Sequence, residues 1–186
     1  MDQRSSVRFG DWMTTWSGGT FWPLDPASHE IKIDDIAHAL SNICRFGGHS
    51  KRFYSVAQHS VLASIYVNGD AEVKKWALLH DAAEAYVGDM VRPLKSQMPT
   101  FQNVERGIMV HVAEAFGLSW GIPEAVKEID EILLATEAWE LMPRQCVERW
   151  SLKHPRAERI KIAPVGPEKA QDLFLKEYEK LFGRRA

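Results

Sequence analysis

Apolar residues recur at helical spacing in one segment after another of this chain, and most segments have recognisable start or stop signals. Ser55 with Gln58 three residues later is typical of a capping box, and Asp70 is placed to cap the next helix. Gly88 and Gly117 favour helix ends. The expected helices span roughly 34–46, 55–68, 70–88, 100–116, 123–139 and a final segment after 166–167. The pattern predicts an all-α fold, a bundle of about six or seven helices.

The remaining stretches, roughly 12–33 and 143–166, are rich in proline or aromatic residues. Each contains a short run of extended character, 30–33 in the first and 159–162 in the second. We expect these runs to pair as a small two-stranded ribbon. The length of 186 residues is typical of one domain, so we expect a single domain over 1–186.

The charge balance limits the classes of partner. The chain has 23 Lys and Arg against 25 Asp and Glu, a net charge of −2 with neutral histidines, which excludes a general binder of nucleic-acid polymers. No run of 18 apolar residues and no apolar signal-peptide core is present, so we expect a cytoplasmic protein without a membrane partner. Cys44 and Cys146 are far apart and indicate neither a disulfide framework nor a zinc knuckle.

Several ionisable residues occupy positions that the periodicity assigns to the core. His59 interrupts the apolar face of the second expected helix. His80 lies on the apolar face of the third, with Asp81 at its border, and Asp130 lies among aliphatic residues of the fifth. A buried imidazole or carboxylate without a partner costs about 2 kcal/mol or more, so each needs a hydrogen bond or a metal ion.

Taken singly, each residue has an ordinary explanation, because a histidine on an apolar face is usually a satisfied core residue and a mid-helix aspartate usually a salt-bridge partner. Together, His59, His80, Asp81 and Asp130 form a two-nitrogen, two-oxygen donor set that leaves two octahedral positions for water and substrate. Two imidazoles argue against Ca²⁺ and make Mg²⁺ less favoured than Mn²⁺, Co²⁺, Ni²⁺, Zn²⁺ or Fe²⁺. We therefore expect one divalent transition metal.

The order of these residues resembles the HD superfamily of metal-dependent phosphohydrolases, in which a His, an adjacent His-Asp pair and a distant Asp bind a divalent cation. The resemblance covers about residues 34–140 and implies an HD-domain helical bundle. The run from His80 through Glu84, followed by Gly88 and Asp89, is similar to the HDxxE…GD run of the HD-domain 5′-deoxynucleotidases and phage-type dATP phosphohydrolases. The stretches 34–40, 45–49 and 54–60 resemble a bacterial set described only as HD hydrolases.

The resemblance implies further roles. In those relatives the Glu and the second Asp act on the attacking water or the leaving group, which implies Glu84 and Asp89 here. An Arg after the first helix and a Lys after the GD run bind phosphate, which implies Arg45 and Lys95. Phe46 stands where the deoxynucleotidases have tryptophan, so the contact to base or sugar differs in this chain.

The residues themselves leave alternatives open. Glu84 can act as a general acid or base, or can orient a ligand histidine. Asp89 can orient water or contact a sugar hydroxyl, or can cap the next turn. Arg45 carries the planar fork that suits phosphate, and His49 in the same glycine-rich loop can reach substrate. Lys95 is a second cation or a solvated surface lysine.

Three further groups of residues are candidates for contacts to a substrate or to a second copy of the chain. A triphosphate substrate would need more cations, for which the chain offers Lys51, Arg52 and Arg92. A base could stack on an aromatic segment whose commoner role is burial against the core, formed by Trp12, Trp16, Phe21 and Trp22. The last helix carries more apolar surface than one face needs, which favours a homodimer or higher homo-oligomer, through Phe174, Leu175, Tyr178 and Phe182.

We therefore expect a metal-dependent phosphohydrolase acting on small (deoxy)nucleotides, either a 5′-deoxynucleotidase or a dNTP phosphohydrolase. The alternative is a non-catalytic HD-type module that senses nucleotides or holds a structural metal. Glu84 and Asp89 favour the enzyme, because a purely structural site needs neither.

Overall fold

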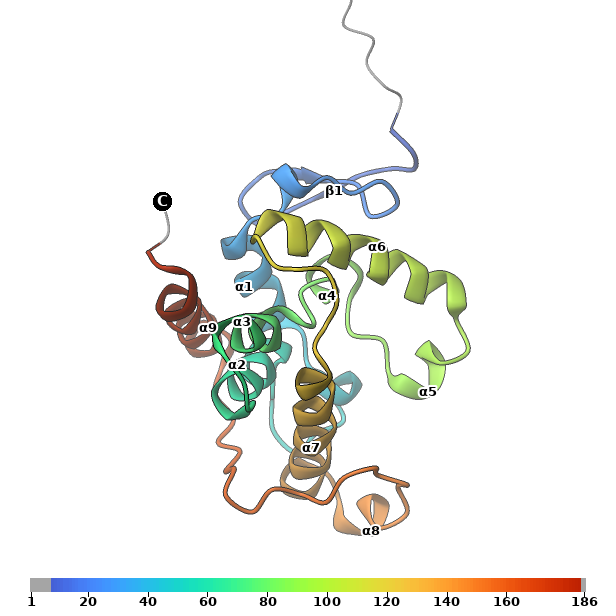
Figure 1. Cartoon of the computed structure of the whole chain (residues 1–186). Coiled ribbons are helices and arrows are strands. Elements are labelled where there is room, and N and C mark those ends of the chain that lie inside the picture. Colours follow the sequence, from blue (N-terminus) through green and yellow to red (C-terminus); the bar gives the residue numbers. More distant parts are fainter. Residues whose placement is uncertain (1–7, 185–186) are drawn as a thin grey trace, which may run out of the picture.

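Helices dominate the computed structural model, which describes residues 8–184 (Figure 1). The long helices are α1 Ile33–Asn42, α2 Val56–Tyr66, α3 Ala71–Leu79, α6 Pro99–Ala115, α7 Glu124–Leu141 and α9 Pro167–Phe182. Three single-turn helices are α4 Glu84–Val87, α5 Arg92–Lys95 and α8 Arg144–Val147, and two 3-10 turns are η1 Ser28–Glu30 and η2 Arg45–Gly48. The predicted all-α bundle with a small ribbon is confirmed. None of the helices within this described range is long and apolar enough to span a bilayer.

Two of the predicted helix starts are confirmed. Ser55 precedes α2 in an extended conformation, and its hydroxyl accepts a hydrogen bond from the backbone N–H of Gln58. Asp70 caps α3 in the same way, accepting from the N–H of Val73 at 3.0 Å. These caps satisfy backbone donors that a helix leaves unpaired at its start. They fix where α2 and α3 begin, and α2 and α3 pack directly against each other.

The ribbon forms from other residues than expected. Strands β1 Met13–Thr14 and β2 Thr20–Phe21 pair antiparallel, while 30–33 runs from η1 into α1 and 159–162 is in no strand. The first long helix begins after Lys32, its cap residue, so Asp34 and Asp35 lie in its first turn. Asp35 accepts hydrogen bonds from the N–H and hydroxyl of Ser17, in the turn between the strands. This local pairing uses residues only a few positions apart, which favours it over the long-range ribbon.

The expected helix over 70–88 is interrupted. Helix α3 ends at Leu79, and α4 begins only at Glu84. Between them the backbone forms i→i+3 hydrogen bonds, among them Ala82 N–H to Leu79 O and Glu84 N–H to Asp81 O, both 2.9 Å. His80 and Glu84 are therefore not on one face of a regular helix, as the periodicity predicted.

Helix α2 lies at the centre of the bundle. It packs against α3, α7 and α9, and α9 also packs against α1 (Figure 1). Eight of its eleven residues are buried, so the helix is covered on nearly all sides rather than on one face. Any polar side chain on α2 must therefore find its partner inside the protein.

The aromatic residues of α9 are used within the same chain. Phe174 is fully buried in the main core. The rings of Tyr178 and Phe182 stack with centroids 4.5 Å apart, and Phe116 from the end of α6 packs edge-on against both. The apolar residues of α9 that favoured a homo-oligomer thus pack within the chain, and the oligomeric state stays a prediction.

Candidate metal centre and cavity

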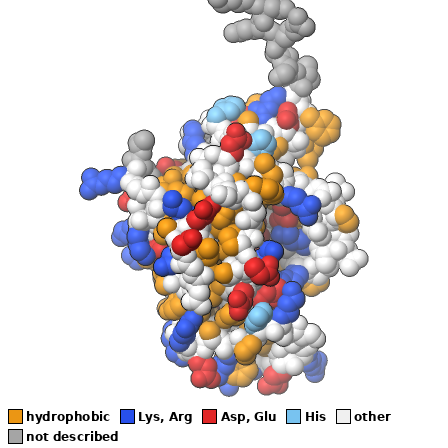
Figure 2. Space-filling view, viewed as in Figure 1, with side chains coloured by type: hydrophobic (Ala, Val, Ile, Leu, Met, Phe, Trp, Pro, Cys, Tyr) orange, Lys and Arg blue, Asp and Glu red, His pale blue; other side chains and the backbone are white. Residues whose placement is uncertain are grey.

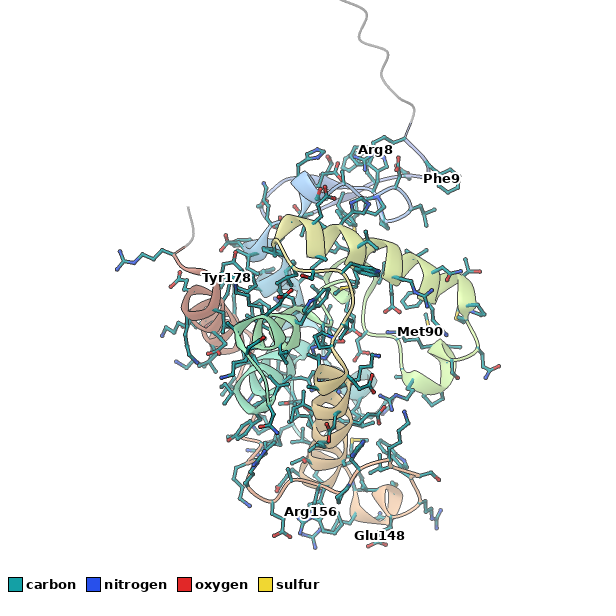
Figure 3. The ribbon with its side chains drawn as sticks, viewed as in Figure 1. Arg8, Phe9, Met90, Glu148, Arg156 and Tyr178 are labelled. Carbon is teal, nitrogen blue, oxygen red and sulfur yellow. The ribbon has the colours of Figure 1, made fainter. Side chains whose placement is uncertain are left out.

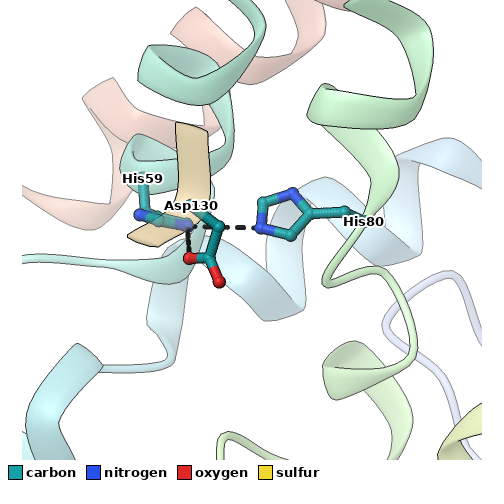
Figure 4. A group of neighbouring side chains, drawn as sticks. All are labelled: His59, His80 and Asp130. Carbon is teal, nitrogen blue, oxygen red and sulfur yellow. Dashed lines mark hydrogen bonds and ion pairs between the residues drawn. The ribbon is translucent and has the colours of Figure 1, made fainter. Parts of the chain in front are cut away.

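His59 occupies the first turns of α2 and has no exposed surface. Its Nδ1–H donates to the Oε1 atom of Glu137 on α7, at 2.6 Å. A ring nitrogen held in this way fixes the orientation of the imidazole and leaves the other nitrogen for a second partner. The Nε2 atom of His59 points toward His80 and Asp130 (Figure 4).

His80 is placed by the end of α3. Its Nδ1 lies 2.8 Å from the carbonyl oxygen of Ala77, and because a carbonyl can only accept, Nδ1 carries the proton. The Nε2 atom lies 3.3 Å from Nε2 of His59, along the dashed line that joins the two rings in Figure 4. The interruption after Leu79 lets the chain turn here, so that Asp81 lies beside the same gap: its Oδ2 atom is 3.3 Å from Nε2 of His80.

A carboxylate from α7 completes the cluster. Oδ1 of Asp130 lies 3.2 Å from Nε2 of His59. The ligand atoms of His59, His80 and Asp130 all lie within 4.8 Å of one another, so these three residues could hold a metal ion. Asp81 is outside that group but adjoins it, with Oδ2 3.8 Å from Nε2 of His59. The expected four residues therefore meet, three of them closely.

The cluster carries coupled charges in this metal-free arrangement. Burial and the charge of Arg45 lower the pKa of His59, but Glu137 and Asp130 outweigh them and raise it to about 9. For Asp130, burial raises the pKa, but the hydrogen bond from His59 and the positive charge around it lower the pKa below its ordinary value. Since a metal ligand must be unprotonated, a cation bound here would replace a proton on His59.

Glu137 is the centre of a buried network that the sequence analysis missed. Its carboxylate has no exposed surface and accepts three hydrogen bonds, from His59, from the hydroxyl of Tyr54 at 2.7 Å and from Nε of Arg45 at 3.0 Å. The positive charges of Arg45 and His59 overcome the effect of burial and hold the pKa of Glu137 below its ordinary value. The orienting role considered for Glu84 therefore belongs to Glu137, since neither histidine has Glu84 as a hydrogen-bond partner.

Arg45 reaches this network because its segment pairs with the start of α2. Cys44 and Ser55 form an antiparallel bridge, flanked by a hydrogen bond from the N–H of Arg45 to the carbonyl of Tyr54 at 2.9 Å. With Nε held by Glu137, the Nη1 atom of Arg45 lies 3.6 Å from Oδ2 of Asp81. Burial lowers the pKa of Arg45, but the charges of Glu137, Asp130 and Asp81 raise it above its ordinary value, so the guanidinium is always charged.

A cavity of about 1010 Å³ opens beside the cluster. Figure 2 shows acidic and basic side chains gathered on this face between α7 and α5. Every predicted site residue except His59 and His80 lines it: Arg45, Phe46, His49, Asp81, Glu84, Asp89, Lys95 and Asp130. Of the extra cations only Arg92 is among the lining residues, and its guanidinium is bound to Glu131 at 3.0 Å. The aromatic segment 12–22 contributes nothing to this lining, so it is not placed to stack a base here. Its commoner role, burial against the core, is confirmed for Phe21, which is fully buried, but not for Trp12 and Trp16, which are more than half exposed.

Two carboxyl groups of the cavity have pKa values above their ordinary values. Glu84 is buried, and its Oε2 atom has no hydrogen-bond partner among residues 8–184. Burial, then the charges of Asp81 and Asp89, raise the pKa of Glu84 well above its ordinary value. Burial and the charge of Asp81 also raise the pKa of Asp89. Carboxyl groups in such surroundings are suited to proton transfer near neutral pH.

Lys95 is not a solvated surface lysine. Its Nζ atom lies 2.7 Å from Oε1 of Glu105 on α6 and 3.9 Å from Oε1 of Glu84. Glu105 is buried and had no place in the sequence analysis, because a glutamate within an amphipathic helix usually faces solvent. It ties the α5 turn to α6 and keeps the ammonium group at the cavity.

The raised pKa of Glu84 implies a stability cost. We expect Glu84→Gln in metal-free protein to be more stable than the parent by about 1 kcal/mol near pH 8. The neutral amide avoids the cost of a buried negative charge beside Asp81 and Asp89. A carboxyl group whose pKa is raised by folding makes the folded protein less stable as the pH rises and the group ionises. The difference in unfolding free energy between the variant and the parent should therefore vanish below the ordinary pKa of 4.5. Urea unfolding at several pH values measures this. Equal stability at every pH, or the same gain for the exposed Glu128→Gln, would contradict the assignment.

Comparison with known proteins gives two relatives at the level of sequence. The chain is 38% identical over 169 residues, 90% of its own length and 93% of the relative's, to the uncharacterized protein YfdR of Escherichia coli K12. It is 32% identical over 142 residues, covering 70% of the chain and 72% of the relative, to an uncharacterized protein of Rhodobacter capsulatus. No family model matches the chain.

Proposed function

The chain belongs to the family of the Escherichia coli protein YfdR, and we propose that it is a divalent-metal-dependent phosphohydrolase of the HD type acting on (deoxy)nucleotides in the cytoplasm. One observation carries the proposal. The Nε2 atoms of His59 and His80 and the carboxylate of Asp130 converge beside a cavity that also holds a largely buried arginine and an acid with a raised pKa. Phosphate ester hydrolysis needs this combination of metal, cation and proton-transfer group.

The residues present fit a transition metal. Both histidines use Nδ1–H for hydrogen bonds to Glu137 and to Ala77, so both Nε2 atoms are available as ligands. The mixed nitrogen and oxygen set favours Mn²⁺, Co²⁺, Zn²⁺, Ni²⁺ or Fe²⁺, with Mg²⁺ less favoured. Such an ion, when bound, supplies a Lewis acid for a phosphoryl oxygen and for water. Asp81 is the remaining candidate ligand in the proposal.

The other residues would act on the substrate directly. Phosphate oxygens would bind to two cations that line the cavity, the Nη1 end of the Arg45 guanidinium and the ammonium group of Lys95. Burial raises the pKa of Glu84 well above its ordinary value, and Glu84 is our choice to transfer a proton at the ester oxygen or the attacking water. Asp89 lies at the same cavity and would orient water or a sugar hydroxyl, with His49 at the exposed rim.

The test is phosphate release by the full chain loaded with Mn²⁺ or Co²⁺. We expect turnover on at least one member of a panel of dNMPs, dNTPs and ppGpp, loss of turnover with EDTA, and a decrease in kcat of about 10²- to 10⁴-fold in Glu84→Gln with its metal retained. Glu128→Gln, an exposed change on α7, should leave kcat unchanged. An absence of turnover on every ester would contradict the enzyme, and full metal binding in that case would favour the non-catalytic sensing or structural module.

A further inference from the structure

The cavity has two chemically different sides. Toward the metal cluster it is lined by charged groups, among them Arg45, Glu84 and Lys95. Where it meets the end of α7 and the segment after α8, the lining is apolar: Phe46, Leu134, Met142, Trp150 and Leu152. Figure 3 labels Met90, on the α4–α5 connection, and Glu148, beside α8; the cavity is lined from both of these segments. At about 1010 Å³ it is at the upper end of the ~300–1,000 Å³ typical of small-molecule sites, and far larger than one phosphate needs.

The apolar side is built by a cluster separate from the main core. Ala138, Met142 and Val147 are buried together, and Phe46, Trp139 and Leu152 pack against them. Three of these six residues also line the cavity. This cluster therefore shapes a wall of the cavity in addition to holding α8 against α7.

Two aromatic residues of this wall are in unusual settings, Phe46 in its backbone conformation and Trp150 in its exposure. Phe46 is the one non-glycine residue with positive φ in the described part of the chain, at 57°, a strained conformation of the kind that clusters at ligand sites. Trp150 is 39% exposed, although a large indole is normally covered. The two ring centroids are 6.3 Å apart with the planes tilted by 37°, so the rings do not stack on each other. The guanidinium of Arg45 lies over the Phe46 ring, with Cζ 5.7 Å from its centroid, which leaves the partly exposed indole of Trp150 as the ring open to another planar group.

We propose that Phe46 and Trp150 form the subsite for the heterocyclic base of the substrate, with Trp150 as a binding residue for the base. This inference rests on the proposed function. It places the base of the same substrate whose phosphate the proposed function places at Arg45 and the metal cluster. A nucleotide has the matching division, with a charged phosphate at one end and a flat apolar face at the other. Stacking of this kind tolerates any base, so the subsite selects nucleotides over simple sugar phosphates.

The experiment compares two substrates that differ only in the base, dAMP and 2-deoxyribose 5-phosphate. In Trp150→Ala we expect kcat/KM for dAMP to fall about 5- to 100-fold while kcat/KM for 2-deoxyribose 5-phosphate stays unchanged, with recovery for dAMP in Trp150→Phe. Trp120→Ala is the matched control, because Trp120 is 55% exposed and lies outside the cavity lining. An equal loss on both substrates, or no loss on dAMP, would overturn the subsite while leaving the phosphohydrolase intact.

Binding without turnover separates the two proposals. Addition of dAMP to metal-free protein should quench tryptophan fluorescence in the parent chain and in Trp120→Ala, and the quenching should be lost in Trp150→Ala. That result with no hydrolysis of any ester would support the subsite and contradict the phosphohydrolase. Quenching that persists unchanged in Trp150→Ala would overturn the subsite whatever the activity.

Discussion

Glu137→Gln is expected to destabilise the protein by about 3–5 kcal/mol, the usual cost of removing one partner of a buried ion pair. The glutamine has nearly the same shape, but it leaves the charge of Arg45 without its closest counter-ion and gives the hydrogen bond from His59 a weaker acceptor. Urea unfolding in metal-free buffer measures the loss. Because a misoriented His59 is a poorer ligand, affinity for Mn²⁺ or Zn²⁺ should also fall about 10- to 100-fold.

The control lies one turn further along the same helix. Glu140 is exposed, so Glu140→Gln should change the unfolding free energy by less than about 0.5 kcal/mol. A change in Glu137→Gln as small as this would mean that the buried network does not hold Arg45 and His59 in place.

Asp130→Asn is expected to abolish stoichiometric metal binding while the protein stays folded. The substitution keeps the size of the side chain but removes the carboxylate whose oxygen lies 3.2 Å from Nε2 of His59. The loss of affinity should exceed 100-fold, because a residue that only orients a ligand already contributes about 10- to 100-fold. Elemental analysis after dialysis measures the metal content, and His80→Ala should give the same result.

Glu128→Gln, two residues earlier on α7, provides the comparison because its side chain is exposed. It should retain as much metal as the parent chain. If either Asp130→Asn or His80→Ala retained one equivalent of metal, that residue would not be a ligand. The expected preference for a transition metal, which depends on its donor atom, would then fail as well.

The sequence predicted most where the determinants are local. Five of the six expected helices are present as single helices, and the sixth is interrupted after Leu79. The caps at Ser55 and Asp70 are at the expected residues, because a cap depends on side chains within three positions. The convergence of His59, His80 and Asp130 was predictable for a different reason, since each is a polar residue in an apolar setting and buried polar groups need partners.

Glu137 was missed although a signal was available. It lies seven residues after Asp130, two turns along α7 on the same face, and so had the same claim to a buried position. What periodicity cannot predict is its partners, because Tyr54 and Arg45 come from segments more than 80 residues earlier in the chain. The interruption between α3 and α4 was equally hidden, since the apolar pattern continues through it while the hydrogen bonds change to i→i+3.

The separate cluster beside α8 has a consequence for how the molecule opens. Ala138, Met142 and Val147 are its buried apolar residues among residues 8–184, whereas α2 and α3 belong to a core of more than thirty. Segments with few buried contacts open locally at a lower free energy than the core. We therefore expect the chain from α8 through Leu152, which carries Trp150 at the cavity, to exchange its backbone amide hydrogens faster than α2 and α3.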